Sequence, residues 1–446
     1  MKYVNKKESI VLFLGDLLIL LDSLWIAMAI RYFEIPKRLW NSDLFWSFSI
    51  LSLIWILSFY IAGLYQKHTL ILKGKISSLL LKAQITNIVI AVMFFYFIPY
   101  FQIAPKTILF IYLVVSSALI YVWRIFIFKF IRPYRKESAI LIGSGDDMKK
   151  LVHEINNNNR YGFKIVNIVD LDSETNPNLE NLLQEKIERH NITLIITDTK
   201  HLKIENLLPK LYNLFFSSIE FLDFQDVYEE IFDQIPISNL NHLWLIDNIK
   251  VKKNIFFNLA KRLSDIFFSL IILIPSLLIY PFVMLAIYLE SRVNPFIVQE
   301  RVGRNNKKIR ILKFRSMTVN DKGNWPTKND ERITRVGKFI RNTRIDELPQ
   351  ILNVLKGDLS LIGPRPDIVG LYNNLSKEIS YYKIRNLVKP GLSGWAQTHQ
   401  EVPPHSVEET KNRLAYDLYY IKNQSLLLDF KIAIQTFRIL VSRTGR

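Results

Sequence analysis

The stretch IFFSLIILIPSLLIYPFVMLAIYL, residues 266–289, decides how the second half of this chain meets a membrane. It is long enough to cross a bilayer as a helix, which takes about 20 apolar residues. A complete crossing would translocate residues 301–350, which carry 14 lysines and arginines. Because prolines bend helices, the sequence predicts a re-entrant helix over about 266–289 with its kink at Pro275, Ser276 and Pro281. An ordinary kinked crossing is the alternative.

Residues 1–135 hold four further apolar runs, at 10–30, 44–64, 78–101 and 107–131. Each approaches the length of a membrane span, so this region is predicted to be a four-helix transmembrane bundle. Lysines and arginines are denser on the face that carries both ends of the bundle, which the positive-inside rule assigns to the cytoplasm. Asp16 and Asp22 lie inside the first run and are either functional or polar contacts within the bundle.

Residues 136–250 alternate between short strands and helices. Strands are predicted at 139–142, 164–169, 192–197 and 219–222, and helices around 148–155, 179–189 and 204–215. This order is typical of a Rossmann-like parallel-sheet domain. Gly143-Ser144-Gly145 and Asp170 follow two strands as in dinucleotide sites, but Asp146 and Asp147 place carboxylates where a pyrophosphate would bind. A structural or dimerising role is therefore favoured over nucleotide binding.

Composition and charge exclude several classes of protein. The 446 residues include no cysteine, which excludes a disulfide scaffold, a thiolate metal site and a cysteine nucleophile. The net charge of +18 divides into +10 on residues 1–135, −8 on 136–250 and +16 on 251–446. Lipid headgroups or a phosphorylated substrate fit this distribution. Nucleic acid does not, because the basic region adjoins an apolar membrane segment and shows no nucleic-acid motif.

The segment RNTRIDELPQILNVLKGD, residues 341–358, concentrates the reactive side chains. Its apolar spacing predicts a helix with Pro349 in the first turn and Gly357 at the stop. Asp346 and Glu347 stand at the helix start, where the helix dipole and nearby cations would keep Asp346 ionised to attack phosphorus. Glu347 would then bind a divalent cation. A helix cap and a surface acidic pair are the structural alternatives.

Basic side chains near this helix suit a multiply charged phosphate. Lys313 and Arg315 lie in the segment KFRSM, Arg341 precedes the acidic pair, and Arg365 stands between two prolines that would fix it rigidly. Guanidinium groups bind phosphate oxygens in a bidentate way, whereas an ammonium acts as a point charge. A solvated basic face or a patch for lipid headgroups is the alternative reading.

These motifs resemble the bacterial sugar transferase domain of monotopic phosphoglycosyl transferases, also called polyprenyl glycosylphosphotransferases. The resemblance covers about residues 255–446, and the preceding spans and sheet domain are similar to the long-form members. The motifs that carry it are KR at 261–262 with Asp265, KFRSM at 313–317, DELPQ at 346–350, NVLKGDLSLIGPRP at 353–366, KPGLSGWAQ at 389–397 and YDLYY at 416–420.

The resemblance implies a mainly helical monotopic catalytic domain over 251–446 and a defined reaction. A sugar 1-phosphate passes from a UDP-sugar to undecaprenyl phosphate, giving polyprenyl diphosphate-sugar and UMP through an aspartyl-phosphosugar, as the first step of surface polysaccharide or glycoconjugate synthesis. It implies Asp346 as nucleophile and Mg²⁺ held by Glu347 with Asp346. Substrate-binding residues would be Lys313, Arg341, Arg365 and Asp417.

The resemblance also implies a place for the protein in the cell. A multi-pass protein of the bacterial inner membrane is expected, with its catalytic domain in contact with membrane lipids on the cytoplasmic face, and a homodimer is expected as well. Two other functions stay open at this point. One is a membrane-tethered NAD-dependent sugar oxidoreductase or epimerase centred on Gly143 and Gly145, and the other is a non-enzymatic assembly scaffold.

Overall fold

The computed structural model describes most of the chain. The described residues are 6–34, 43–62, 64–65, 73–97, 106–131, 137–158, 161–171, 185, 189, 191–198, 219–238, 240–249, 255–318, 332–400 and 402–442. They form two compact units, one of Met1–Ile140, Val152–Ile168 and Asn181–Leu194, the other of Leu141–Leu151, Val169–Glu180 and Ile195–Arg446. The predicted domain boundaries at residues 135 and 250 fall outside the described residues, so the three-domain division stays a prediction.

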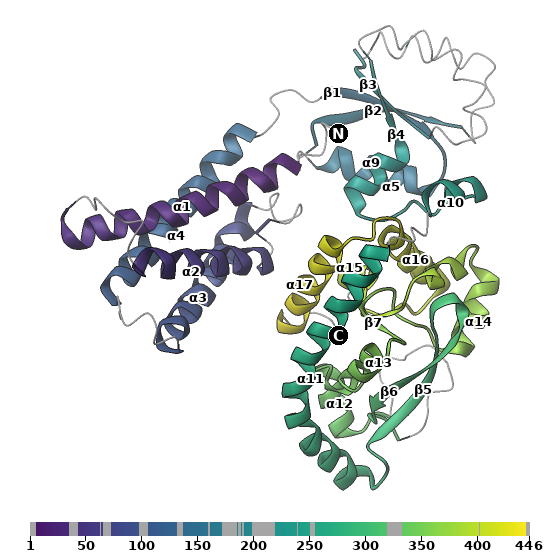
Figure 1. The fold of residues 1–446 in the computed structure, drawn as a ribbon. Coiled ribbons are helices and arrows are strands. Elements are labelled where there is room, and N and C mark those ends of the chain that lie inside the picture. Colours follow the sequence, from purple (N-terminus) through teal and green to yellow (C-terminus); the bar gives the residue numbers. More distant parts are fainter. Residues whose placement is uncertain are drawn as a thin grey trace. The chain divides into compact units, whose positions relative to one another are not determined.

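Four helices form the N-terminal part of the chain, as the apolar runs predict (Figure 1). They are α1 (Lys6–Tyr32), α2 (Asp43–Ile61), α3 (Lys73–Phe97) and α4 (Lys106–Ile131). Among the described residues, three helical stretches are long and apolar enough to cross a membrane: Ile10–Tyr32, Thr107–Arg124 and Ile255–Ser291. The apolar parts of α2 and α3, Phe45–Ile61 and Ala83–Phe95, are shorter. The long apolar helices indicate association with a membrane.

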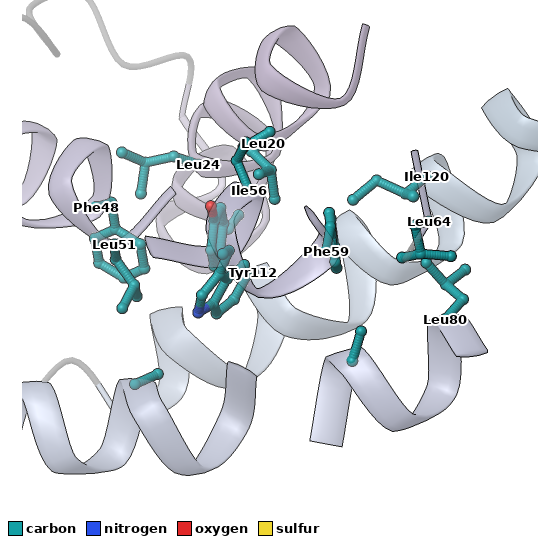
Figure 2. Close-up of a cluster of buried hydrophobic side chains, with 14 of the residues drawn as sticks. Leu20, Leu24, Phe48, Leu51, Ile56, Phe59, Leu64, Leu80, Tyr112 and Ile120 are labelled. Atoms are coloured by element: carbon teal, nitrogen blue, oxygen red, sulfur yellow. The ribbon is translucent and has the colours of Figure 1, made fainter. Parts of the chain in front are cut away.

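Large apolar side chains fill the space between these four helices. Figure 2 shows Leu20 and Leu24 of α1, Phe48 and Phe59 of α2 and Tyr112 of α4 as members of one buried cluster. Tyr112 stacks on Trp55 at 5.1 Å between ring centroids. Aromatic pairs of this kind add stability beyond the area that they bury. The four helices therefore have a packed interior of their own.

A charged pair is buried among these four helices. Asp16 of α1 and Arg124 of α4 are 0% and 2% exposed and bond directly to each other. Asp16 also accepts from the Tyr65 hydroxyl at 2.8 Å, and Arg124 donates to the Leu64 carbonyl at 2.9 Å, just beyond α2. Asp22 is exposed. Of the two possibilities for Asp16, the structure supports a polar contact within the bundle, which ties α1, α4 and the end of α2 together.

We expect Asp16→Leu to lower the thermal unfolding temperature of the detergent-solubilised protein strongly. It leaves Arg124 buried without its counter-ion, a change that costs about 3–5 kcal/mol. The double variant Asp16→Leu, Arg124→Leu should recover most of the loss, since an apolar pair can replace a buried ion pair. Asp22→Leu is the matched control and should change little. If the double variant lost as much thermal unfolding temperature as Asp16→Leu and Arg124→Leu lose when added together, the ion pair would not have the role given to it here.

The predicted parallel sheet is confirmed. Its strands are β1 (Glu137–Gly143), β2 (Phe163–Asp170), β3 (Leu194–Thr197) and β4 (Glu220–Asp223), in the order β2-β1-β3-β4. Ala139 to Gly143 are all buried, as strands covered on both faces are. Helix α5 (Asp146–Asn157) follows β1, and α9 (Phe224–Phe232) and α10 (His242–Asn248) follow β4. The helices predicted around 179–189 and 204–215 lie almost wholly outside the described residues.

The C-terminal part of the chain is mainly helical with two small sheets, as expected (Figure 1). Helix α11 (Ile255–Ser291) leads into an antiparallel hairpin of β5 (Phe296–Val302) and β6 (Lys308–Phe314). Parallel strands β7 (Ser360–Ile362) and β8 (Gly391–Ser393) form the second sheet. The remaining elements are η4 (Arg304–Asn306), α12 (Arg335–Asn342), η5 (Ile345–Glu347), α13 (Gln350–Lys356), α14 (Val369–Glu378), η6 (Tyr382–Leu387), α15 (Trp395–His399), α16 (Val407–Lys422) and α17 (Leu426–Ser442).

Helix α11 continues through Pro275 and Pro281 as one helix. Its re-entrant course through a membrane stays a prediction. Its ribbon bends along its course in Figure 1, as expected where prolines remove hydrogen bonds. Near its start, Asp265 accepts from the Leu361 N–H and the Ser360 hydroxyl, both at 3.1 Å. Near its end, Glu290 accepts from two N–H groups that open α12, at 2.8 and 3.0 Å. Both ends of α11 thus contact the same compact unit.

Candidate active site

The acidic pair lies on a short turn that precedes α13. Arg344 has φ +59°, which places it in the left-handed region and turns the chain from α12 into η5. Pro349 then caps α13, and Gly357 ends it with φ +99°. The predicted helix and its stop are confirmed, but Asp346 and Glu347 occupy the separate turn η5 rather than the first turn of the helix. This turn places the two carboxylates side by side.

Glu347 is held by three cations. Arg365 donates to both of its carboxylate oxygens, at 2.5 Å to Oε1 and 3.4 Å to Oε2. The Lys313 ammonium and the Arg344 guanidinium each lie 3.8 Å from Oε1. Burial would raise the pKa of Glu347, but the charges of Arg365 and Lys313 outweigh it and hold this pKa below its usual range. Glu347 is therefore ionised throughout the physiological pH range.

Asp346 differs from Glu347 in that one of its two carboxylate oxygens forms no hydrogen bond with the described residues. It is 9% exposed, and its Oδ1 atom is buried without a hydrogen-bond partner among the described residues. Burial, and then the negative charge of Glu347, raise the pKa of Asp346 to about 6. Lys313, Arg341 and Arg344 oppose this shift. The result is a carboxylate that is poorly solvated yet ionised at neutral pH, as a nucleophile requires.

Lys313 and Arg365 bring positive charge to this pair from two other elements. Lys313 lies on β6, and burial, offset in part by Glu347, lowers its pKa to about 8. Arg341, in the last turn of α12, acts on Asp346 through its charge. The Arg315 Nε donates to the Asn294 carbonyl at 2.9 Å, which binds its guanidinium to the backbone between α11 and β5. The structure thus groups three of the predicted substrate-binding cations, Lys313, Arg341 and Arg365, around the carboxylates.

A buried network holds Arg365 in place from behind. Its carbonyl oxygen accepts from Arg385 at 2.8 Å and from Arg413 at 2.6 Å. Arg385 in turn bonds Asp367 and lies 2.8 Å from Asp417, which is 1% exposed. The structure therefore places Asp417 behind Arg365 and not beside the acidic pair. Its predicted contact with substrate stays a prediction.

Sequence reasoning missed three members of this network: Asp367, Arg385 and Arg413. All are buried, and Arg413 bonds Asp367 at 3.1 Å. One signal was available, because Arg413 and Asp417 are four residues apart on α16 and so share a helix face. Asp367 and Arg385 carry no local signal, since they meet only through the tertiary fold.

Glycines let the loops behind the site approach closely. A Cβ on Gly391 would lie 2.1 Å from the Gly363 nitrogen, and one on Gly363 would lie 2.5 Å from the Lys389 carbonyl oxygen. These contacts join β7 and β8, the strands that lead into the Pro364-Arg365-Pro366 loop and the Gly394-Trp395 turn. Gly337 allows α12 to lie against Ser316 in the same way, since a Cβ on Gly337 would lie 2.1 Å from the Ser316 carbonyl oxygen. The GPRP and KPGLSGW motifs are thus explained by backbone contact.

The carboxylates fit a divalent cation that arrives with phosphate. Asp346 offers a buried oxygen without a partner among the described residues, and Glu347 lies next to it. Magnesium is usually held by one or two carboxylates together with substrate phosphates and water. Within the part of the chain that the structure describes, no group of three or more His, Cys, Asp or Glu side chains could hold an ion. The donor set is therefore suited to a cation shared with a substrate.

Two family models match this chain. The model described as "Bacterial sugar transferase" matches residues 256–443, and the one described as "CoA-binding domain" matches residues 49–207. The first match contains all of the side chains assembled above. The second begins in α2 and extends into the sheet domain.

Several curated proteins are similar to parts of the chain. An Aeromonas hydrophila UDP-N-acetylgalactosamine-undecaprenyl-phosphate N-acetylgalactosaminephosphotransferase is 45% identical over 162 residues, which cover 36% of this chain and 38% of that protein. The Escherichia coli (strain K12) UDP-glucose:undecaprenyl-phosphate glucose-1-phosphate transferase is 29% identical over 317 residues, 68% of this chain and 67% of that protein. The Rhizobium leguminosarum bv. phaseoli exopolysaccharide production protein PSS is 41% identical over 190 residues, 40% of this chain and 92% of that protein.

Proposed function

Because the chain belongs to the bacterial sugar transferase family, we propose that it transfers a sugar 1-phosphate from a UDP-sugar to undecaprenyl phosphate. One observation carries the proposal. The buried carboxylate of Asp346 has an oxygen without a hydrogen-bond partner among the described residues. It adjoins the carboxylate of Glu347, which forms ion pairs with Arg365 and Lys313. Similar proteins carry names for this reaction, with N-acetylgalactosamine or glucose as the sugar.

The proposed reaction has two displacements at one phosphorus atom. A carboxylate oxygen of Asp346 attacks the β-phosphorus of the UDP-sugar, the bond from that phosphorus to the bridging oxygen breaks, and UMP leaves. A phosphate oxygen of undecaprenyl phosphate then attacks the same phosphorus and releases Asp346. A covalent intermediate divides one difficult step into two easier ones. The product is undecaprenyl diphosphate-sugar, the starting lipid for a surface glycan.

Positive groups around Asp346 would stabilise the charge that develops on the phosphoryl oxygens. Arg365 and Lys313 now neutralise Glu347, and both can turn to phosphate oxygens when the diphosphate binds. The backbone of Arg365, from which this side chain would turn, is fixed by hydrogen bonds from Arg385 and Arg413 to its carbonyl oxygen. Asp346 and Glu347 would hold Mg²⁺, which neutralises diphosphate charge when bound.

Helix α11 supports a monotopic arrangement on the membrane. Both of its ends contact one compact unit, whereas a helix that crosses the bilayer has its ends on opposite sides. Its outer surface is apolar and exposed, for example at Leu278 (73%) and Phe282 (75%). Helix α17 adds exposed Leu427 and Phe430 while burying Ile432, as an interfacial amphipathic helix does. We propose that α11 enters and leaves the cytoplasmic leaflet of the bacterial inner membrane.

The homodimer expected from the sequence is also a proposal. A second copy would be seen as a doubled protein mass when the detergent-solubilised chain is measured by size-exclusion chromatography with light scattering. A mass equal to one chain plus its detergent would reject the dimer.

A direct test of the proposed function is release of UMP by the purified protein. The protein would be incubated with undecaprenyl phosphate, Mg²⁺ and each member of a panel of UDP-sugars. We expect UMP and a lipid-linked sugar phosphate with at least one sugar, and this result would also identify the substrate. UMP release from none of the panel, under conditions that activate a relative in parallel, would reject the proposal.

The first displacement should show a bell-shaped dependence on pH. Its rate rises as pH increases through about 6, where Asp346 becomes ionised, and falls above about 8, where Lys313 loses its charge. Single-turnover UMP release without undecaprenyl phosphate is the appropriate measurement, because the lipid phosphate itself titrates near pH 6. Lys313→Arg should move the alkaline limb upward by about a pH unit or more, since arginine stays charged. An unmoved alkaline limb would contradict the role of Lys313.

A further inference from the structure

The glycine loop of the sheet domain lies where ligands bind in related folds. Strand β1 has β2 on one side and β3 on the other, so the strand order reverses beside it. In open parallel sheets the ligand crevice forms at such a point, outside the carboxyl ends of the strands. Gly143-Ser144-Gly145 follows β1 and leads into α5, and Gly145 has φ +88°. The loop therefore has the position of a phosphate-binding loop.

The chain's own residues cover this loop. Asp147, in the first turn of α5, is 7% exposed and accepts from the Ser238 N–H at 3.0 Å and the Ser238 hydroxyl at 2.8 Å. It also accepts from the Tyr228 hydroxyl at 3.0 Å. A Cβ on Gly145 would lie only 3.3 Å from the Ser238 Cβ. Ser238 thus lies directly against the glycine that would have to admit a phosphate.

A phosphate at this loop would meet two obstacles. The carboxylate of Asp147 would repel it at short range, in a setting of low solvent access. The ligand would also have to displace Ser238 and leave Asp147 and Tyr228 without their hydrogen bonds. The first turn of α5 carries Asp146 as well, so the helix end that attracts anions in other proteins is already opposed by two negative charges.

The segment that covers the loop is anchored at its other side to the catalytic helices. We call residues 224–238, which comprise α9 and the chain from its end to Ser238, the α9 segment. Its Glu229 pairs with Lys422 of α16 at 2.6 Å, and the Asp233 carbonyl accepts from the Trp395 indole at 2.8 Å. The Ile235 N–H donates to the Ala415 carbonyl at 3.2 Å, and its side chain is fully buried. Helix α16 is also the helix that supplies Arg413 and Asp417 behind Arg365.

We propose that the glycine loop is an intramolecular docking site for the α9 segment, and that it binds neither CoA nor a dinucleotide. Asp147 takes the place of the ligand phosphate as the group that accepts hydrogen bonds at the crevice. The loop, the α9 segment and α16 belong to one compact unit, so the sheet domain supports the catalytic helices through this contact. The family model for residues 49–207 carries a CoA-binding description. In this chain Asp147, within that range, accepts a hydrogen bond from Ser238, which lies beyond it.

Ligand binding is the first part of the test. The full-length protein in detergent would be titrated with CoA and with NAD⁺ by equilibrium dialysis up to millimolar concentration. We expect no saturable binding of either ligand. UDP-sugars are not used as probes because the proposed active site would bind them. Saturable binding of CoA or NAD⁺ that Gly145→Val abolishes would overturn the proposal.

Hydrogen exchange is the second part, with a matched pair of variants. Asp147→Ala should raise amide exchange in residues 224–238 and 414–422 by about tenfold, the effect of losing roughly one buried hydrogen bond's worth of stability. Asp146→Ala should leave exchange there unchanged, because the Asp146 side chain is 88% exposed and its ion pair is with Lys149 on the same helix. If Asp147→Ala does not fold, Ser238→Ala, which keeps the backbone contact, should give a smaller rise of about threefold. Unchanged exchange in the folded variants would overturn the proposal.

Discussion

Asp346→Asn should abolish UMP release, lowering the rate of the first displacement by about 10⁴-fold or more, as loss of a nucleophile does. The amide keeps the size of the side chain but cannot form a stable bond to phosphorus. The fold should survive the change, because Asp346 Oδ1 has no hydrogen-bond partner among the described residues. The measurement is single-turnover UMP release with UDP-sugar in excess, alongside the thermal unfolding temperature.

Asp358→Asn provides the matched control for this experiment. Asp358 follows α13 as Asp346 precedes it, and it pairs with Lys356 at 2.9 Å near the surface. The control should keep UMP release within about twofold, since a surface ion pair contributes little. Retained UMP release in Asp346→Asn would contradict the assignment of the nucleophile. A large loss of UMP release in Asp358→Asn would show that removing any negative charge near α13 lowers the rate. The loss in Asp346→Asn would then not identify the nucleophile.

Arg385→Ala should cause the largest loss of stability in the catalytic region. It removes the guanidinium that lies between Asp367 and Asp417 and leaves two buried carboxylates partly unpaired. Breaking such a buried pair costs about 3–5 kcal/mol. For a unit of this size, the thermal unfolding temperature should fall by about 10 °C. UMP release should fall too, because the Arg365 carbonyl loses one of its two donors.

The exposed neighbour Lys383 offers a control in the same turn. Lys383→Ala should leave both the unfolding temperature and UMP release nearly unchanged. Arg385→Lys keeps the charge but cannot reach both carboxylates in the same way, so it should give an intermediate loss. An Arg385→Ala protein as stable as the wild type would contradict the role given to this network.

Local sequence signals located the acidic turn and its helix well. Pro349 and Gly357 bound α13 as expected, because a proline cap and a left-handed glycine act within a few residues. The face of the helix was harder to predict. The apolar spacing puts Leu348, Ile351, Leu352 and Leu355 on one helical face. Leu352 is nevertheless 43% exposed, while Val354 is fully buried. Which face of α13 is buried depends on how the helix packs against β6 and α11. The periodicity of a single helix does not reveal these partners.

The support behind Arg365 could not be read from the sequence. Asp367 and Arg385 are 18 residues apart, and Asp417 is 32 residues further along. No local rule joins them, because the contact depends on how η6 and α16 lie against the Pro364-Arg365-Pro366 loop. The Ser238 contact with Asp147 has the same character, since its partners are 91 positions apart in the sequence. Sequence patterns identified the residues proposed to react, and the fold identifies the residues that fix their positions.

The prolines of α11 show a different limit. Their positions predicted a kink in a re-entrant helix, and the structure has one helix that continues through both of them. A return to the same side is favoured by the polar contacts at its two ends, at Asp265 and Glu290. Neither residue stands out in sequence as a partner for a distant N–H group.

The most direct test of the central claim is the mass of the protein after it meets a UDP-sugar. The purified chain would be mixed with its UDP-sugar and Mg²⁺ without undecaprenyl phosphate, quenched within seconds, digested and examined by mass spectrometry. We expect the peptide that contains Asp346 to gain the mass of one sugar phosphate, with release of about one UMP per active site. Adding undecaprenyl phosphate should remove the added mass. UMP formed only in the presence of the lipid phosphate, with no added mass on this peptide, would contradict a covalent intermediate on Asp346.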